Sequence, residues 1–344
     1  MAAMVTTGAF RYQRSSDPGT GGIWHRPAGV PHDGPVSATT RSASAAAARR
    51  GELAAFLRLR RERITPQDVG LPGGPRRRTP GLRREEVAER AGVGVAWYTW
   101  LEQGRAINPS VQVLDAIAGA LLLGPAEREH LRRLADVPGA AGSAESPAAE
   151  IPVPPGAKAL HTILDSLNPL PAGLVGARYD VLAFNDAYAA LDPRMVLLPP
   201  PERNVLWRLF TAERESQPLV DWEREVSFMV GHLRAEFGRR LQDPQWQAYI
   251  RRLSAASPLF AEMWARHDVL APATHRKAFR TVDGREVTIT ATGFTPAEAP
   301  GTKLWIYTPD GPDAERVLGE LLARYRRLGA AGLVAAGAPG RPGG

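Results

Sequence analysis

Between residues 48 and 134, apolar side chains recur at the spacing of one face of an α-helix, with polar residues between them. The pattern predicts a first helix over 48–64, two short helices within 82–105, a fourth after Asn108-Pro109-Ser110 and a last one opened by Pro125. Few residues in this segment alternate as those of a strand would. Five helices in so short a segment predict a compact all-α domain over 48–137.

Residues 82–105 form the centre of this pattern, because two short helices meet there at Gly92-Val93-Gly94. Small residues such as Ala88 let the helices cross closely, and Gly92 can supply the positive φ that ends a helix. Tyr98 and Leu101 give the second helix a stripe toward the same core. The arrangement favours a helix-turn-helix, whose second helix lies in the major groove of DNA. An ordinary helical hairpin in a bundle core would show the same spacing.

A second set of regular elements begins near residue 157 and mixes helices with strands. Strands are expected at 174–176, 179–185, 277–282, 286–293 and 303–308. Asp283-Gly284 is a strong signal for a hairpin turn between two of them. Several helices separate the first two strands from the last three, and a helix over 313–328 follows. This order predicts an α+β domain, with a five-stranded antiparallel sheet and helices on one face.

Segments without apolar periodicity flank and separate these two sets of elements. They are rich in glycine, alanine, serine and proline, and such segments bury too little apolar surface to order themselves. We expect a disordered tail over 1–47, a linker over 138–156 and a disordered tail over 329–344. The two domains are then 48–137 and 157–328.

Positive charge is concentrated just before and within the central motif. Residues 41–84 carry twelve arginines against Glu52, Glu62 and Asp68, a net of +9. The whole chain carries +7, so the remaining residues sum to −2. Arginines beside a candidate groove helix indicate contact with phosphate groups.

Composition excludes several kinds of site. The chain has no cysteine, which rules out disulfides, thiolate metal sites and cysteine nucleophiles. Its seven histidines are scattered without the spacing of metal ligands, so we expect neither a metal nor a cofactor. No apolar run has the length of a membrane span, and no secretory signal is apparent. We therefore expect a cytoplasmic protein that does not contact membranes.

Three consecutive segments give the helical domain a family resemblance. EEVAERAGV, WYTWLEQGR and NPSVQVLDAIAGAL resemble the lambda-repressor-like helix-turn-helix family, also called the xenobiotic-response-element (XRE) family, over roughly 53–134. The resemblance implies binding to double-stranded DNA. Two features depart from the family. Gly94 stands where the family usually has a Ser or Thr that caps the reading helix, and the loop carrying RRRTPG is longer.

The resemblance and the helix geometry together indicate which residues contact bases. If Tyr98 and Leu101 point inward, the other positions of the second helix point outward at least in part. These positions are Val95, Ala96, Trp97, Thr99 and Trp100. They offer mainly apolar contact to thymine methyl groups, with Thr99 as the polar exception. Packing of the two tryptophans against the first helix or the long loop is an open alternative.

Arginines flank this helix on both sides. Arg83, Arg84 and Arg105 are expected to hold phosphates. Arg76–Arg78 are expected to reach phosphate or an adjacent minor groove. Glu102 is expected to pair with an arginine rather than to contact a base.

The second domain carries a further resemblance. RYDVLAFN, PPERNVLWRLF, VDWE and LWARHDV look like the ligand-binding domain of MmyB-like transcription regulators. Together with RRRTPGLRREEVA and WYTWLEQGR, the likeness covers about 51–307. The resemblance implies a PAS-like domain that binds a fatty-acid-like ligand.

An acyl ligand with a carboxylate needs apolar walls and one cationic or donor group at the mouth of its pocket. The candidate wall residues are Phe184, Trp207, Phe210, Trp222 and Trp264. The candidate carboxylate partners are Arg178, Arg203, Asn204 and His267. Two alternatives stay open, namely ordinary core packing of the aromatic residues and salt bridges of the polar ones with Asp180, Glu202 or Asp268.

These features predict a sequence-specific, ligand-responsive transcriptional regulator that is not an enzyme. One short helix reads few bases, so we expect a homodimer on two half-sites. Two other classes remain open. A DNA-tethered enzyme would use His267-Asp268 or the Asp221/Glu223/Glu225 cluster, although no phosphate-binding glycine loop or G-x-S-x-G motif supports it. An antitoxin-like module would bind a protein partner.

Overall fold

The computed structural model describes residues 11–12, 24–25, 38–72, 81–136, 157–271, 273–297, 299 and 301–337. The chain divides into two compact units, Met1–Ser44 and Ala45–Gly344. In the first unit, β1 (Arg11–Tyr12) pairs antiparallel with β2 (Trp24–His25). The predicted linker over 138–156, the arginines Arg76–Arg78 and most of the predicted tail over 1–47 lie outside the described residues.

The N-terminal helices follow the predicted order. They are α1 (Ala38–Arg63), the short 3-10 helix η1 (Gln67–Val69), α2 (Arg84–Ala91), α3 (Val95–Glu102), α4 (Val111–Ala120) and α5 (Pro125–Leu134). Phe56, Val87, Tyr98 and Leu114 are fully buried in their common core. The first helix begins at Ala38 instead of Ala48. Residues 43–48 contain five alanines, and alanine favours helix even where no apolar stripe is visible.

The turn between α2 and α3 has the predicted chemistry. Gly92 adopts φ 64° and ψ 32°, the left-handed conformation that ends α2. The Val93 N–H donates to the Ala88 carbonyl at 2.9 Å, which fixes the turn. Gly94 begins α3 in an extended conformation without a side-chain cap, so the departure from the usual Ser or Thr leaves α3 uncapped by its own N-terminal residue.

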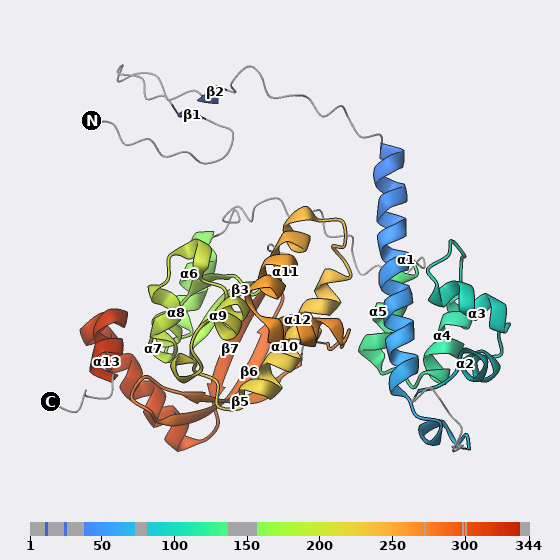
Figure 1. Ribbon diagram of the computed structural model, residues 1–344. Helices are drawn as coiled ribbons and strands as arrows, with labels where there is room; N and C mark the ends of the chain where they lie inside the picture. The colour runs from blue at the N-terminus through green and yellow to red at the C-terminus, as the bar shows by residue number, and fades with distance from the viewer. Residues whose placement is uncertain are drawn as a thin grey trace. The chain divides into compact units, whose positions relative to one another are not determined.

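The C-terminal domain is built on one five-stranded sheet in the order β4-β3-β7-β6-β5, in which all neighbours are antiparallel (Figure 1). The strands are β3 (Ala172–Gly176), β4 (Val181–Phe184), β5 (His275–Arg280), β6 (Glu286–Phe294) and β7 (Thr302–Pro309). Gly284 adopts φ 83° in the turn between β5 and β6, where the Asp-Gly pair predicted a hairpin. The predicted α+β class and antiparallel sheet are confirmed.

Helices pack against both faces of this sheet. The α-helices are α6 (Ala157–Ser166), α7 (Asp186–Leu191), α8 (Pro193–Leu197), α9 (Val205–Thr211), α10 (Trp222–Phe237), α11 (Pro244–Ala256), α12 (Pro258–Ala265) and α13 (Pro312–Gly337). Two short 3-10 helices, η2 (Pro200–Glu202) and η3 (Arg214–Ser216), flank α9. Ile289 of β6 faces a large core shared with α9, α10, α12 and α13. Leu174 and Leu304 turn the other way and pack with Leu164 of α6. The expectation of helices on one face alone was therefore wrong, because α6 needs a partner for its own apolar stripe.

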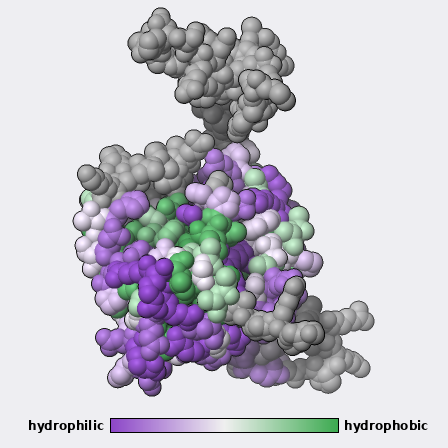
Figure 2. All heavy atoms as spheres, turned by 90° about the vertical axis from the view of Figure 1, so that its left-hand side faces the viewer, coloured by the Kyte–Doolittle hydropathy of each residue, from purple (hydrophilic) through white to green (hydrophobic). Residues whose placement is uncertain are grey.

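The final helix extends beyond the predicted boundary at Leu328. It bends at Gly329, which adopts φ 68°, and continues to Gly337. Leu333 is fully buried, which explains why this part of the predicted tail is helical. Figure 2 shows an apolar area bordered by hydrophilic residues on the side of the C-terminal domain where α13 lies. No helix in the described part of the chain is long and apolar enough to cross a membrane.

Candidate functional site

The outward face of α3 is largely apolar, as the spacing predicted. Val95 and Trp100 are 42% and 41% exposed, and Ala96 is exposed beside them. Trp97 is half-buried and packs against the core. For this tryptophan, packing within the protein therefore accounts for part of its surface, as the alternative to base contact allowed. Thr99, also half-buried, donates its hydroxyl hydrogen to the Val95 carbonyl at 2.8 Å, which leaves its oxygen as an acceptor.

The flanking arginines differ in how firmly they are held. Arg83 and Arg105 are exposed, and the Arg105 guanidinium lies 5.8 Å from the centre of the Trp100 ring. Arg84 remains 42% exposed although its Nη2 lies 3.0 Å from a carboxylate oxygen of Glu102. These positions leave all three guanidinium groups accessible beside α3.

Glu102 holds this region together from inside, and its predicted pairing with arginine is confirmed. Its carboxylate is fully buried and accepts hydrogen bonds of 2.8 Å from both Nε and Nη2 of Arg61. Burial raises the pKa of the Glu102 carboxyl, but the bonds from Arg61 and Arg84 outweigh it and hold that pKa below its usual range. Arg61 also donates to the Leu82 carbonyl at 2.8 Å, which ties α1 to the start of the helix-turn-helix.

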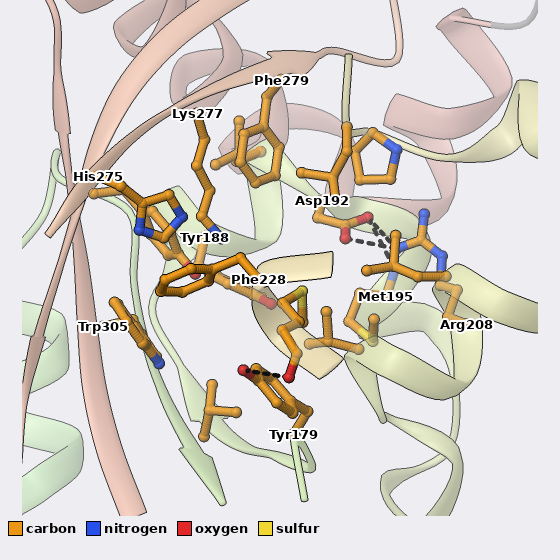
Figure 3. A pocket seen from close by; sticks show the side chains of 18 residues that line it. Tyr179, Tyr188, Asp192, Met195, Arg208, Phe228, His275, Lys277, Phe279 and Trp305 are labelled. Carbon is orange, nitrogen blue, oxygen red and sulfur yellow. Dashed lines mark hydrogen bonds and ion pairs between the residues drawn. The ribbon is translucent and has the colours of Figure 1, made fainter. Parts of the chain in front are cut away.

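The C-terminal domain contains a pocket between the sheet and the helices α7 to α10 (Figure 3). It encloses about 760 Å³ of space between its atoms, its open mouth included. Most of the lining is apolar or aromatic, namely Val175, Tyr179, Tyr188, Leu191, Met195, Val205, Leu209, Pro218, Leu219, Phe228, Met229, Phe279, Trp305 and Tyr307. One acidic residue, Asp192, and three basic residues, Arg208, His275 and Lys277, complete it. Such a mixture is typical of small-molecule sites.

Two of the charged residues that line the pocket, Arg208 and Asp192, form an ion pair with each other. Arg208 donates from Nη1 to both carboxylate oxygens of Asp192, at 2.7 and 2.5 Å. Asp192 also accepts from the Met195 N–H at 3.3 Å and so begins α8. Both side chains are buried, and the pair contributes no net charge to the pocket.

A second charged group lies on the other side of the pocket in Figure 3. His275 and Lys277 alternate along β5 and point to the same face. The His275 Nε2 and the Lys277 Nζ each lie 3.1 Å from Oε2 of Glu225 on α10. Burial raises the pKa of the Glu225 carboxyl, but His275 and Lys277 outweigh it and lower that pKa overall. Burial lowers the pKa of Lys277, and the Glu225 carboxylate opposes this.

None of the nine residues predicted for the ligand site lines this pocket. Phe210 and Trp264 each pack against Phe260, and Trp222 packs against Phe210, at ring-centroid distances of 5.2 to 5.7 Å. Arg252 covers the Trp207 ring at 4.0 Å, and Arg203 covers Phe184 at 5.4 Å. These contacts agree with ordinary core packing, which was the alternative to a pocket wall for these aromatic residues.

The polar residues of that set are also engaged elsewhere. Asn204 caps α9 and donates to Asp180 at 2.9 Å, while Arg178 pairs with the same aspartate at 3.4 Å. Arg203 donates to the Leu198 carbonyl at 2.6 Å. The sequence signal for the residues that do line the pocket was the alternation of His275, Lys277 and Phe279, but the predicted strand began at Lys277 and so left His275 out.

The residues considered for acid–base catalysis are not brought together. His267 lies beside Arg234, with its Nδ1 3.2 Å from Nη1, and its neighbour Asp268 pairs with Arg60 at 3.4 Å. Glu225 pairs with Lys277, whereas the side chain of Asp221 lies 3.8 Å from Arg224 at the surface. This arrangement gives no support to the enzyme alternative.

Helix α10 joins the pocket to the N-terminal helices. Phe228 and Met229, in the middle of α10, line the pocket. In its second half, Arg234 is 2% exposed at its side chain, and its Nη1 donates to Glu52 of α1 at 3.1 Å. Arg133 of α5 donates to the Ala235 carbonyl at 3.2 Å.

The end of α10 also packs closely on α5. A Cβ added at Gly238, the residue that follows α10, would lie 2.8 Å from the Cε1 of His130. Burial lowers the pKa of His130 to about 3, so the ring is neutral where it meets this glycine. Gly238 therefore leaves no space between the end of α10 and His130 of α5 for a larger side chain.

Comparison with family models places two matches along the chain. Residues 52–131 match a helix-turn-helix domain, and residues 157–322 match the MmyB-like transcription regulator ligand binding domain. A comparison with curated protein sequences gave no match. The first match contains α3 with its exposed face, and the second contains every residue that lines the pocket. The chain therefore belongs to the ligand-sensing, DNA-binding transcription regulators in which a helix-turn-helix domain precedes an MmyB-like ligand-binding domain.

Proposed function

We propose that this regulator binds an operator as a homodimer and that a fatty-acid-like ligand in the pocket changes its affinity for DNA. The pocket carries the ligand half of the proposal, because apolar and aromatic walls surround a small group of charged side chains. The exposed face of α3, flanked by arginines, supports the DNA half.

On DNA, α3 lies in the major groove with Val95, Ala96 and Trp100 against base edges. These side chains select thymine methyl groups by apolar contact, since the indole N–H of Trp100 is their one hydrogen-bonding group and none of them can form the bidentate contacts of Asn, Gln or Arg. Arg83, Arg84 and Arg105 hold the phosphates on either side and fix the register of the helix. One α3 reads too few bases for useful specificity, so a second copy supplies the other half-site.

The ligand acts through α10. An occupied pocket presses on Phe228 and Met229, and the same helix contacts α1 through Arg234 and α5 through Ala235 and Gly238. A ligand shifts such an equilibrium only by the difference in its affinity for the two arrangements. The proposal therefore requires two arrangements of α10 that differ in their fit to the ligand.

Capture of genomic DNA fragments by the purified, delipidated protein tests the DNA half. We expect sequencing at physiological salt to return an inverted repeat with half-sites about one helical turn apart, or a multiple of it. Retention of DNA without a common motif would contradict a sequence-specific regulator.

Operator affinity with and without added fatty acid tests the ligand half. We expect added decanoate to change the operator Kd by fivefold or more, which is within the usual range of allosteric coupling. An identical operator affinity in both conditions would contradict ligand control of DNA binding.

A further inference from the structure

The charged residues of the pocket do not cancel one another. Asp192 and Arg208 form a closed pair with no net charge. The second group contains one carboxylate, Glu225, against the ammonium of Lys277 and the imidazole of His275. Its net charge therefore depends on whether His275 is protonated.

The hydrogen-bond partners of His275 favour the protonated ring. Its Nδ1 lies 2.9 Å from the Ala273 carbonyl, and its Nε2 lies 3.1 Å from the Glu225 carboxylate. A carbonyl oxygen and an ionised carboxylate can only accept, and a neutral imidazole has one N–H to donate. Both bonds form together only in the imidazolium, whose ring centre lies 4.5 Å from that of Phe228 with the two rings tilted by 47°. With His275 protonated, the group carries one positive charge in excess.

We propose that Glu225, His275 and Lys277 form a headgroup site for amphiphiles that bear a single negative charge, with the apolar tail along the remaining walls. This inference rests on the proposed ligand function of the pocket and names the chemistry that selects the ligand. The side chains of His275 and Lys277 are only 14% and 12% exposed, so their excess charge is poorly solvated and an anion stabilises it. A neutral head leaves that charge uncompensated, and a cationic head adds to it.

Lys277 has the geometry to meet such a head. Its ammonium has three N–H donors, and Glu225 is its one ion-pair partner within the described ranges. Among the described side chains, the other titratable groups of the lining offer no unpaired positive charge to an anion. The tyrosines Tyr179, Tyr188 and Tyr307 are neutral, because burial raises the pKa of each. Arg208 already forms an ion pair with Asp192.

Calorimetric titration of the delipidated full-length protein tests the headgroup site with three probes of equal tail length. They are decanoate, decanol and decyltrimethylammonium. We expect decanoate to bind at least tenfold more tightly than either of the others.

Three variants separate the members of the group. Lys277→Met and His275→Gln each remove one positive charge and should weaken decanoate binding tenfold or more without changing decanol binding. Glu225→Gln removes the carboxylate that competes for both cations and should tighten decanoate binding. Arg276→Gln is the matched control, because Arg276 lies between the two residues on β5 but is 70% exposed and pairs with Asp310.

The outcomes distinguish two failures. Equal binding of decanoate and decanol, unchanged in all three variants, would overturn the headgroup site while keeping the pocket as an apolar ligand site. Absence of binding by every probe would overturn the proposed ligand function and this inference with it. Circular dichroism checks that each variant folds, and the preference of the wild-type protein among the probes tests the proposal without any substitution.

Discussion

Glu102 is a single residue whose charge matters for stability. It is fully buried, and Arg61, whose side chain is 8% exposed, donates two hydrogen bonds to it. Removing one partner of a buried pair leaves the other charge uncompensated, which typically costs about 3–5 kcal/mol. We expect Glu102→Gln to lower the free energy of unfolding by about 3 kcal/mol at pH 7, measured by urea denaturation of the helix-turn-helix domain within the full chain.

The pH dependence of that difference is a check on its electrostatic origin. The pKa of Glu102 is lower in the folded protein than in the unfolded one. Its contribution is therefore fully present above the unfolded pKa of about 4.3 and is lost as the pH falls through the folded value. The stability gap between wild type and Glu102→Gln should shrink below pH 4. A gap of constant size would point to lost packing instead.

Residues around α3 should divide into those that hold phosphate and those that read bases. We expect Arg84→Ala and Arg105→Ala to weaken binding to all sequences alike and to reduce the salt slope by about 1 each. Trp100→Ala should change base preference at one position of each half-site and leave the salt slope unchanged. Binding to a randomised operator library at two salt concentrations measures both quantities. A change of base preference in Arg84→Ala would assign that residue to readout.

At the scale of elements, the contact between α10 and α5 offers a test of coupling. Gly238 has a helical backbone with φ −56°, so alanine fits the backbone but not the space beside His130. We expect Gly238→Ala to reduce the effect of decanoate on operator affinity at least threefold, because α5 can no longer pack on the end of α10. The affinity for decanoate itself should stay within a factor of two, since the substituted position lies outside the pocket lining.

Gly319→Ala is the matched control for this substitution. Gly319 lies in α13, and an added Cβ there would meet nothing within 4 Å. Alanine at such a helical position typically stabilises a protein by about 0.5–1 kcal/mol and should leave the ligand response intact. If Gly238→Ala responds to decanoate as fully as Gly319→Ala does, the ligand signal does not pass through this contact.

The helices and strands could be predicted from the sequence more fully than the residues that line the pocket. Helical spacing and the Asp283-Gly284 turn are local signals, and they gave the helix-turn-helix and the β5–β6 hairpin. The headgroup residues come from β5 and α10, fifty positions apart, so no local pattern joins His275 to Glu225. The predicted aromatic residues are apolar enough for a pocket wall, but Trp222 and Trp264 satisfy that preference by packing in the core. Which apolar side chains meet a cavity is decided by long-range packing.

At the scale of the whole molecule, the proposed homodimer makes operator geometry a sensitive test. Two copies of α3 related by two-fold symmetry reach the same face of DNA only if the half-sites are one helical turn apart, or a multiple of it. We expect insertion of five base pairs between the half-sites, about half a turn, to reduce affinity toward that of one half-site. Insertion of ten should restore most of it. Gel-shift titration of these operators, together with sedimentation of the free protein, measures this. Affinity that is indifferent to the five-base-pair insertion would mean that each copy binds alone, and specificity would then have to come from contacts beyond α3.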